Sequence, residues 1–467
     1  METNNQQVRT DEFAGVDTKE TPSQPSCMQL SEFLPALFCA LEKEGVHFCV
    51  LRNYERFPAC NNGRDIDCLI RASDLPLAIR ALKSIQGIRI VGYSERSYVA
   101  NIFLEGISST AHYRALQVDF YLSLTWKGLV YLPTDAVLQA AVPRPAGNST
   151  FLVPSTVHEA ITSLLTSLII GGSVREKYFP QVQRTFASKK AEVIAALMPQ
   201  FGARAATSLT NSVIAGDRER ILGYVKTLRA SLVLRSFVRR PLRSTLAVAR
   251  HYACEVAIRY SPRTLETVCI LSLGSCDEDV IIDALIPILQ SSAVVVEKRA
   301  PGLQLLMRRD SAGRSVAANC DTEAPYCRLA FMARIVRSVM EEWLSQFNRM
   351  PALRVIKGHS FDLIIGAEWH RYGIPRWFAR LVWNLLPTPD LWVFLDPKTE
   401  QMRATNRECP CSQTLRQLSA YRSFGRMKDR YVILEAPKPG FCVTEKAYSA
   451  IIDMLVRRSD TRLRKRF

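Results

Sequence analysis

The sequence lacks any run of apolar residues long enough to cross a bilayer. Its most apolar candidate, Leu164–Ile170, is far shorter than the roughly 20 residues that a spanning helix needs. The start of the chain, Met1–Pro25, is polar and carries acidic residues, so it also lacks the basic start and apolar centre of a signal peptide. These absences predict a cytoplasmic protein without a transmembrane helix.

Paired cysteine motifs and acidic residues are also scarce. The 13 cysteines are scattered and form no repeated CxxC pair, which argues against a disulfide framework and against a zinc site. Asp and Glu number 44 against 61 Lys and Arg, a formal charge of +17. A basic excess of this size predicts attraction to polyanions, such as nucleotides or an anionic membrane face, and says nothing about the fold.

The composition is otherwise that of an ordinary globular chain. With 48% hydrophobic and 22% charged residues, it excludes a collagenous, coiled-coil or wholly disordered protein. The predicted class is a multidomain mixture of α/β and α+β folds, because helix and strand patterns succeed one another along the chain. The expected divisions are a disordered tail 1–27, an α+β domain 28–150 with a mixed sheet, a helical region and basic linker 151–262, an α/β domain 263–458 with a parallel sheet covered by helices on both faces, and a basic tail 459–467.

The helical region ends in a basic segment, Arg229–Arg250, that contains six arginines and no acid. One interpretation is a surface for anionic lipid, and hence a peripheral membrane contact. The other is a pair of solvated helices that connects two domains. A nucleic-acid surface would rest on charge alone, and we do not expect one.

Three acidic residues of the first domain lie on strands that are otherwise apolar. Asp65 and Asp67 lie two residues apart on the predicted strand Asp65–Ile70, so their side chains share one face. Asp119 interrupts a second predicted strand, Leu116–Leu122. Carboxylates held side by side repel one another unless a cation lies between them, and Mg²⁺ prefers oxygen ligands. We therefore predict an Mg²⁺ site at these three residues.

Two acids from one strand and a third from a neighbouring strand resemble the metal triad of the nucleotidyltransferase superfamily. The flanking motifs Val50–Glu55 and Leu124–Gly128 are similar to nucleotidyltransferases found beside surface-polysaccharide enzymes in bacteria, and the resemblance covers roughly residues 30–200. It implies that Asp65, Asp67 and Asp119 are catalytic, that they hold Mg²⁺, and that the substrates are a nucleotide and a small acceptor.

The sequence departs from this family before the acids. The superfamily usually places Gly-Ser there, whereas this chain has Arg52 and Asn53. Arg52 could hold phosphate by its planar fork, and Arg64 and Lys127 are further candidates for nucleotide binding. In an alternative interpretation, the two acids of the strand flank a turn and pair with Arg64 and Arg71.

The segment after the predicted strand Val268–Leu273 has the strand, loop and helix layout of a phosphate-binding loop but lacks most of the residues that bind phosphate. Only Gly274 fits, followed by Ser275. The places of the second glycine and the lysine hold Asp279 and Val280. Without the lysine, the usual mode of ATP binding is lost, which argues against kinase activity.

The rest of this domain nevertheless resembles the thymidylate-kinase branch of P-loop kinases. Pro387–Asp396 is similar to the strand that carries the family's Pro-Asp-Leu motif, and Arg403 and Arg407 are similar to its lid. The Asp-Arg pair expected after Leu363–Ile365 is replaced by Gly366-Ala367-Glu368. Two lost phosphate-handling motifs indicate a pseudokinase.

Three functions remain open from the sequence. The first is an Mg²⁺-dependent nucleotidyltransferase with a C-terminal pseudokinase, in bacterial surface-polysaccharide synthesis. The second is a non-catalytic regulatory or assembly protein made of two decayed nucleotide-handling domains. The third is a thymidylate-kinase-like nucleoside monophosphate kinase. The sequence gives neither the acceptor, the nucleotide nor the oligomeric state.

Overall fold

The computed structural model describes most of the N-terminal half of the chain and parts of the C-terminal half. The described residues are 28–59, 65–110, 113–146, 149–260, 265–272, 278–291, 295–299, 352–357, 376–385, 388–397, 430–436 and 441–467, with single residues within 333–343 and 419–422. In these segments no helix is both long and apolar enough to cross a bilayer. The architecture is mixed α/β and contains one mixed and one wholly parallel sheet, as the alternating patterns predicted.

The first domain is built on a six-stranded mixed sheet. Its strands run in the order β1-β5-β6-β3-β2, and β4 pairs with β5. The neighbours β3 and β6 are parallel, whereas β2–β3, β5–β6 and β4–β5 are antiparallel. The strands are β1 Met28–Gln29, β2 Phe48–Val50, β3 Asp65–Ile70, β4 Arg89–Glu95, β5 Val99–Thr110 and β6 Tyr113–Tyr121.

Two helices cover one face of this sheet, α1 Leu30–Lys43 and α2 Leu75–Ser84. In α1 the apolar residues recur at helical spacing, and all six of them are buried. They pack with the side chains of Ile66, Cys68, Val118 and Phe120 in one core. Because side chains alternate along a strand, residues 65, 67 and 119 face away from this core.

The helical region lies against the opposite face and has its own core. That core joins Leu69 of β3 to helices as distant in sequence as α8. The elements between residues 124 and 260 are β7 Leu124–Trp126, β8 Leu129–Leu132, α3 Thr134–Gln139, β9 Val142–Ala146, β10 Ser149–Val153, α4 Thr156–Leu165, a π-helical turn Thr166–Gly171, α5 Phe179–Ser188, α6 Lys190–Phe201, α7 Ala203–Ala215, α8 Arg218–Arg239 and α9 Pro241–Tyr260.

The C-terminal sheet has five parallel strands in the order β12-β13-β11-β14-β15. The central strand β11 is the first in sequence, so the chain moves to one edge and then crosses to the other, as in doubly wound folds. The elements are β11 Leu265–Ser272, α10 Glu278–Ser291, β12 Val295–Arg299, β13 Ala352–Lys357, α15 Arg376–Leu385, β14 Leu391–Pro397, β15 Tyr431–Ala436 and α18 Phe441–Arg466.

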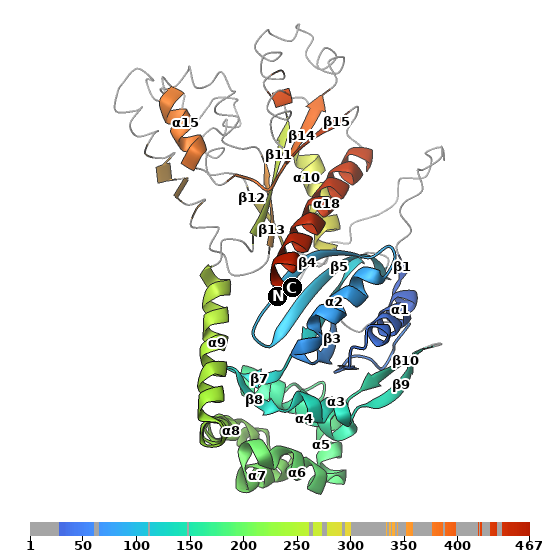
Figure 1. Ribbon diagram of the computed structural model, residues 1–467, viewed down its shortest axis with the longest axis vertical. Helices are drawn as coiled ribbons and strands as arrows, with labels where there is room; N and C mark the ends of the chain where they lie inside the picture. The colour runs from blue at the N-terminus through green and yellow to red at the C-terminus, as the bar shows by residue number, and fades with distance from the viewer. Residues whose placement is uncertain are drawn as a thin grey trace, which may run out of the picture.

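Helix α18 connects the two sheets, and Figure 1 shows it between them. Ile451 and Leu455 of this helix are buried in the core of the parallel sheet. That core also contains Val91 of β4, a strand of the mixed sheet. The end of the helix reaches the first domain, where Leu463 belongs to the core under α1 and α2. The residues predicted as a basic tail, 459–467, are therefore helical up to Arg466 and take part in both domains.

One further boundary and one strand differ from the sequence prediction. Strands β9 and β10 form an antiparallel hairpin across position 150, and Phe151 and Val153 are buried in the core of the first domain, so that core extends a few residues further. Strand β13, which pairs with both β11 and β12, was not predicted. Leu363–Ile365 and the Gly366-Ala367-Glu368 that follow them lie outside the described residues.

Candidate functional site

Asp65, Asp67 and Asp119, which we call the carboxylate triad, lie on neighbouring strands of the mixed sheet. In the parallel pair β3–β6, Asp67 stands opposite Asp119 and Asp65 opposite Gln117. Residues at matched positions of paired strands point to the same face. The triad therefore lies on the face away from α1 and α2, on the side of the helical region.

The three carboxyl groups converge. One oxygen from each lies within 4.8 Å of the corresponding oxygens of the other two. Asp67 and Asp119 are buried, and Asp65 is partly buried. The structure thus brings together the three acids that the sequence pointed to, whereas their role in metal binding and catalysis stays a prediction.

Arg52 supplies a positive charge to this cluster. It follows β2, and two of its three guanidinium nitrogens engage Asp67: Nε donates to Oδ2, and Nη2 donates to Oδ1 at 3.0 Å. Nη2 also lies 3.4 Å from the Tyr121 hydroxyl. Burial acts to lower the pKa of Arg52, but the hydrogen bond and charge of Asp67 outweigh it and raise that pKa. Arg71, one of the two partners that the alternative interpretation proposed, instead pairs with Asp135 at 2.8 Å.

Asp119 is held by two neutral amides. Asn101 Nδ2 and Gln117 Nε2 donate to its Oδ1 at 2.6 and 2.7 Å. Burial raises the pKa of Asp119 to about 6, because the two amides only partly compensate for the lost hydration and the charges of Asp67 and Asp65 add to it. Burial, and then the charge of Asp67, also raise the pKa of Asp65. Both groups would ionise more readily beside a cation.

The triad fits a magnesium ion in donor type and spacing. Two oxygens bound to one Mg²⁺ at about 2.1 Å lie at most about 4.2 Å apart, so oxygens within 4.8 Å of one another need little movement. When ionised, three carboxylates beside one guanidinium leave two negative charges, which one divalent cation balances. Asp65, Asp67 and Asp119 are the residues that would hold the ion.

The residues just before α5, which include Arg175, Lys177 and Tyr178, bring further positive charge beside Arg52 and were not found from the sequence. Asn53 has a left-handed backbone, φ 62°, which is a conformation that glycine adopts easily and asparagine tolerates. Its Oδ1 accepts hydrogen bonds from Lys177 Nζ at 3.2 Å and from the Tyr178 hydroxyl at 2.9 Å. Arg175 acts electrostatically on Asp65. Only the charges just before α5 hinted at this arrangement, since the contacts span more than 120 residues of sequence.

Of the other predicted site residues, those that the structure describes do not join the triad. Lys127 is exposed in the turn between β7 and β8, where its ammonium lies over the rings of Trp126 and Tyr252 at 5.1 and 5.9 Å. Asp279 and Val280 stand in the first turn of α10, and Val280 is exposed. Arg64, Gly274, Ser275, Arg403 and Arg407 lie outside the described residues.

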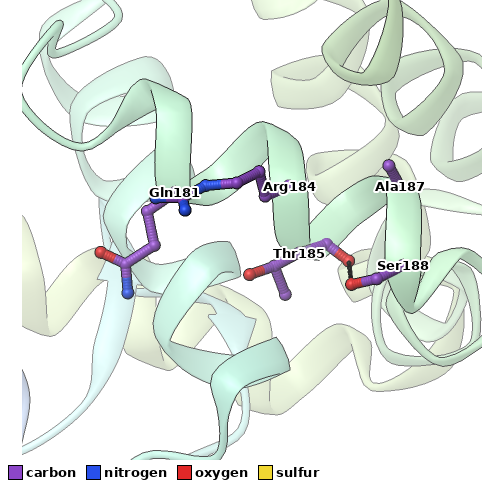
Figure 2. Close-up of a pocket in the computed structure, with 5 residues that line it drawn as sticks. All are labelled: Gln181, Arg184, Thr185, Ala187 and Ser188. Atoms are coloured by element: carbon purple, nitrogen blue, oxygen red, sulfur yellow. Dashed lines mark hydrogen bonds between the residues drawn. The ribbon is translucent and has the colours of Figure 1, made fainter.

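An open hollow of about 800 Å³ lies on α5 (Figure 2), and no residue of the triad lines it. It is lined by Gln181, Arg184, Thr185, Ala187 and Ser188. Ser188 Oγ donates to the Thr185 carbonyl at 3.3 Å, a contact within the helix. Arg184 is the one charged side chain among these five, and no acid lines the hollow, so we assign it no chemistry.

Comparison with known proteins gives distant structural similarities only. No family model matches the chain, and no curated protein matches it. One similar solved structure is a NadR protein in complex with NAD and AMP-PNP, at 14% identity and a TM-score of 0.28, with 48% of this chain and 64% of that chain covered. Another is a gluconokinase from Sinorhizobium meliloti 1021, at 12% identity and a TM-score of 0.21, with 42% of this chain and 94% of that chain covered. At these TM-scores neither similarity assigns a fold or a function to this protein.

Proposed function

We propose that the first domain is an Mg²⁺-dependent nucleotidyltransferase that acts on a small hydroxylated or phosphorylated acceptor. The observation that carries the proposal is the convergence of three carboxylates from β3 and β6 within 4.8 Å. A bound Mg²⁺ would neutralise charge on the phosphates and activate the attacking hydroxyl. A role in bacterial surface-polysaccharide synthesis belongs to the same proposal and rests on the resemblance of residues 30–200 alone.

The protein's own residues would position the nucleotide. Asp65 is the most accessible member of the triad, so a substrate approaches from its side. Arg52 pairs with Asp67, and Lys177 donates to the side chain of the next residue, Asn53, so both bring positive charge to this end of the site. Arg175 adds a third positive charge close enough to influence Asp65. Guanidinium and ammonium groups bind phosphate oxygens, and we assign this part of the site to the phosphates.

We further propose that the C-terminal domain does not transfer phosphate. The first turn of α10 carries Asp279 and the exposed Val280 where a phosphate-binding loop would carry glycine and lysine. A pseudokinase of this kind would regulate the first domain or bind its acceptor. Titration of the full-length protein with a fluorescent ATP analogue tests this. Micromolar binding that survives substitution of Asp65 but is lost on substitution of Val280 would contradict it.

The test of the nucleotidyltransferase is direct. The full-length protein is incubated with each of the four radiolabelled nucleoside triphosphates and Mg²⁺ or Mn²⁺, and pyrophosphate release and label transfer are measured. We expect release with at least one nucleotide and a loss of two orders of magnitude or more in Asp65→Asn. Asp135→Asn is the matched control, because it removes an exposed carboxylate that pairs with Arg71 outside the triad.

One observation favours a second function. Arg52 already neutralises Asp67, as an arginine would in a site that has lost its metal. The protein would then be a non-catalytic regulatory or assembly factor. This alternative predicts no pyrophosphate release and no shift of the melting temperature by millimolar Mg²⁺ with nucleotide. An active enzyme should show both the release and the shift.

A further inference from the structure

The corner between helices α8 and α9 exposes large apolar side chains. The helices meet at Arg240, and the residues on either side are Leu234, Val238, Leu242 and Leu246, with exposed fractions of 66, 73, 85 and 71%. Within each helix the two residues are four positions apart and share a face. Figure 1 shows α8 and the start of α9 at the end of the molecule away from the parallel sheet. Scattered exposed aliphatic residues are common, but four around one corner indicate a binding surface.

The same corner is strongly basic. Between Arg229 and Arg250 the chain carries six arginines and no acid. Arg239, Arg240 and Arg243 are exposed at the corner itself, interleaved with the apolar residues. Any partner must therefore bring both an apolar layer and negative charge.

The corner is held in place by the body of the helical region. Leu228 and Leu232 of α8 are fully buried in its core. Arg239 NH1 donates to the Pro199 carbonyl at 2.7 Å, and Ser244 Oγ donates to the Ser236 carbonyl at 2.8 Å, which ties the first turn of α9 to the last turn of α8. The exposed leucines are thus presented on anchored helix ends, and ordering them on binding costs little entropy.

Charge and hydrophobicity together decide between partners. The phosphates of a nucleic acid would pair with the arginines, but they would offer no apolar surface to the four aliphatic side chains. A second copy of the chain, meeting this corner across a two-fold axis, would satisfy the leucines but would oppose arginines to arginines with no acid in the segment. An anionic phospholipid surface offers an acyl layer for the leucines and headgroup phosphates for the arginines.

We propose that the α8–α9 corner, with Leu234, Val238, Leu242 and Leu246 as its apolar contacts and Arg239, Arg240 and Arg243 as its charged contacts, docks the protein on an anionic phospholipid bilayer. The helices lie on the membrane and do not cross it. Docking is independent of the carboxylate triad, and it places the helical region against the lipid.

The test is sedimentation of the full-length protein with lipid vesicles. Vesicles of phosphatidylcholine alone are compared with vesicles that contain about one third phosphatidylglycerol, at low and at 0.5 M salt. We expect binding to the anionic vesicles that weakens with salt. Leu242→Ser with Leu246→Ser should lower the partition coefficient tenfold or more. Arg240→Gln and Arg243→Gln should each lower it roughly fivefold. Leu222→Ser and Arg220→Gln are the matched controls, because they change exposed residues near the start of α8, at the opposite end of that helix from the corner.

Several outcomes would overturn the proposal. They are equal binding to neutral and anionic vesicles, absence of sedimentation with either, or the same loss in a control variant. A dimer in light scattering that Leu242→Ser with Leu246→Ser dissociates would assign the corner to a second copy instead. Displacement of the protein from vesicles by a DNA oligonucleotide, with equal binding of the leucine variant to DNA, would assign it to nucleic acid. Circular dichroism of each variant shows that a loss of binding is not a loss of fold.

Discussion

At the scale of single residues, Arg52 and Asp119 determine the electrostatic state of the triad. Arg52 neutralises one carboxylate through a two-point contact with Asp67. Asp119 is buried among neutral amides, and its pKa is raised to about 6. Asp65 and Asp67 could be paired from the sequence because strand periodicity puts residues i and i+2 on one face. The amides of Asn101 and Gln117, and the fork of Arg52, could not be found there, since they depend on how three strands and a loop are arranged.

Asp119→Asn should separate metal binding from stability. The carboxamide can still accept the two hydrogen bonds at Oδ1, and it removes a buried negative charge. We therefore expect a melting temperature in metal-free buffer at pH 7.5 that is equal to or above that of the wild type, and loss of any Mg²⁺-induced shift. Differential scanning fluorimetry with and without Mg²⁺ measures both. A large loss of stability without metal would show that the charge of Asp119 supports the fold.

The same residue predicts a pH dependence in metal-free buffer. Because the pKa of Asp119 is raised to about 6 from its ordinary value of 3.8, the folded state binds more protons between these values than the unfolded state. Its contribution to stability is therefore fully present below about pH 4 and is lost as the pH rises through about 6, by at most about 3 kcal/mol. Urea unfolding of the wild type between pH 4.5 and 7 should show this decline, and Asp119→Asn should reduce it.

Arg52→Gln, in contrast to Asp119→Asn, should lower the stability of the metal-free protein. It leaves the buried Asp67 without its cation, and removing one partner of a buried ion pair costs on the order of 3 kcal/mol. The triad then carries more uncompensated charge, so Mg²⁺ should raise the melting temperature by more than it does in the wild type. Arg52→Lys keeps the charge but loses the fork, and should lie between the two. Equal Mg²⁺ shifts in all three proteins would show that the ion does not bind at Asp67.

At the scale of elements, apolar periodicity predicted most helices and strands of the first domain. Strand Asp65–Ile70 coincides with β3, and the predicted strand Leu116–Leu122 lies within β6 except for its last residue. Hairpin β9–β10 was missed because Pro143 and Pro145 lie within β9 and indicated a linker. Strand β13 was missed because Arg354, which is buried, interrupts its apolar residues. In both cases tertiary contacts override the local signal.

Gly128 is a test of how the β7–β8 hairpin is held on α9. Its φ is +85°, and a Cβ there would lie 2.4 Å from the carbonyl oxygen of Ala247. Gly128→Ala should therefore force the turn and the helix apart and lower the melting temperature by several degrees. Gly223→Ala is the control, because nothing lies within 4 Å of a Cβ at that helical position, and it should be neutral or slightly stabilising. Equal melting temperatures for both variants would contradict the close approach of the hairpin to α9.

At the scale of the whole molecule, the two sheets share a helix, and the sequence did not predict it. The sequence predicts a basic tail after residue 458, but Leu463 of this segment is buried in the core of the first domain. The charged residues pair across the contact: Arg466 with Glu95, and Lys83 with Asp460. Such contacts join positions more than 350 residues apart, a distance over which local sequence patterns carry no information.

Leu463→Ala should destabilise the first domain although it lies at the end of the chain. Truncation of a buried leucine costs about 2–5 kcal/mol. Arg466→Gln removes an exposed ion pair and should cost less than about 1 kcal/mol. Chemical unfolding followed by tryptophan fluorescence compares the two. If Leu463→Ala were as mild as Arg466→Gln, the end of α18 would contribute no packing to the first domain.

The place of Leu463 has a consequence for the order in which the protein is made. The first core is nearly complete when residue 153 has been synthesised, but one of its buried side chains belongs to residue 463. At roughly 5–20 residues per second, the ribosome needs on the order of half a minute to add the chain in between. During that time the surface that α18 later covers on β4, including Val91, is open to other chains. A nascent chain stalled within this interval should therefore bind ribosome-associated chaperones through the first domain, and release of the finished chain should end that binding.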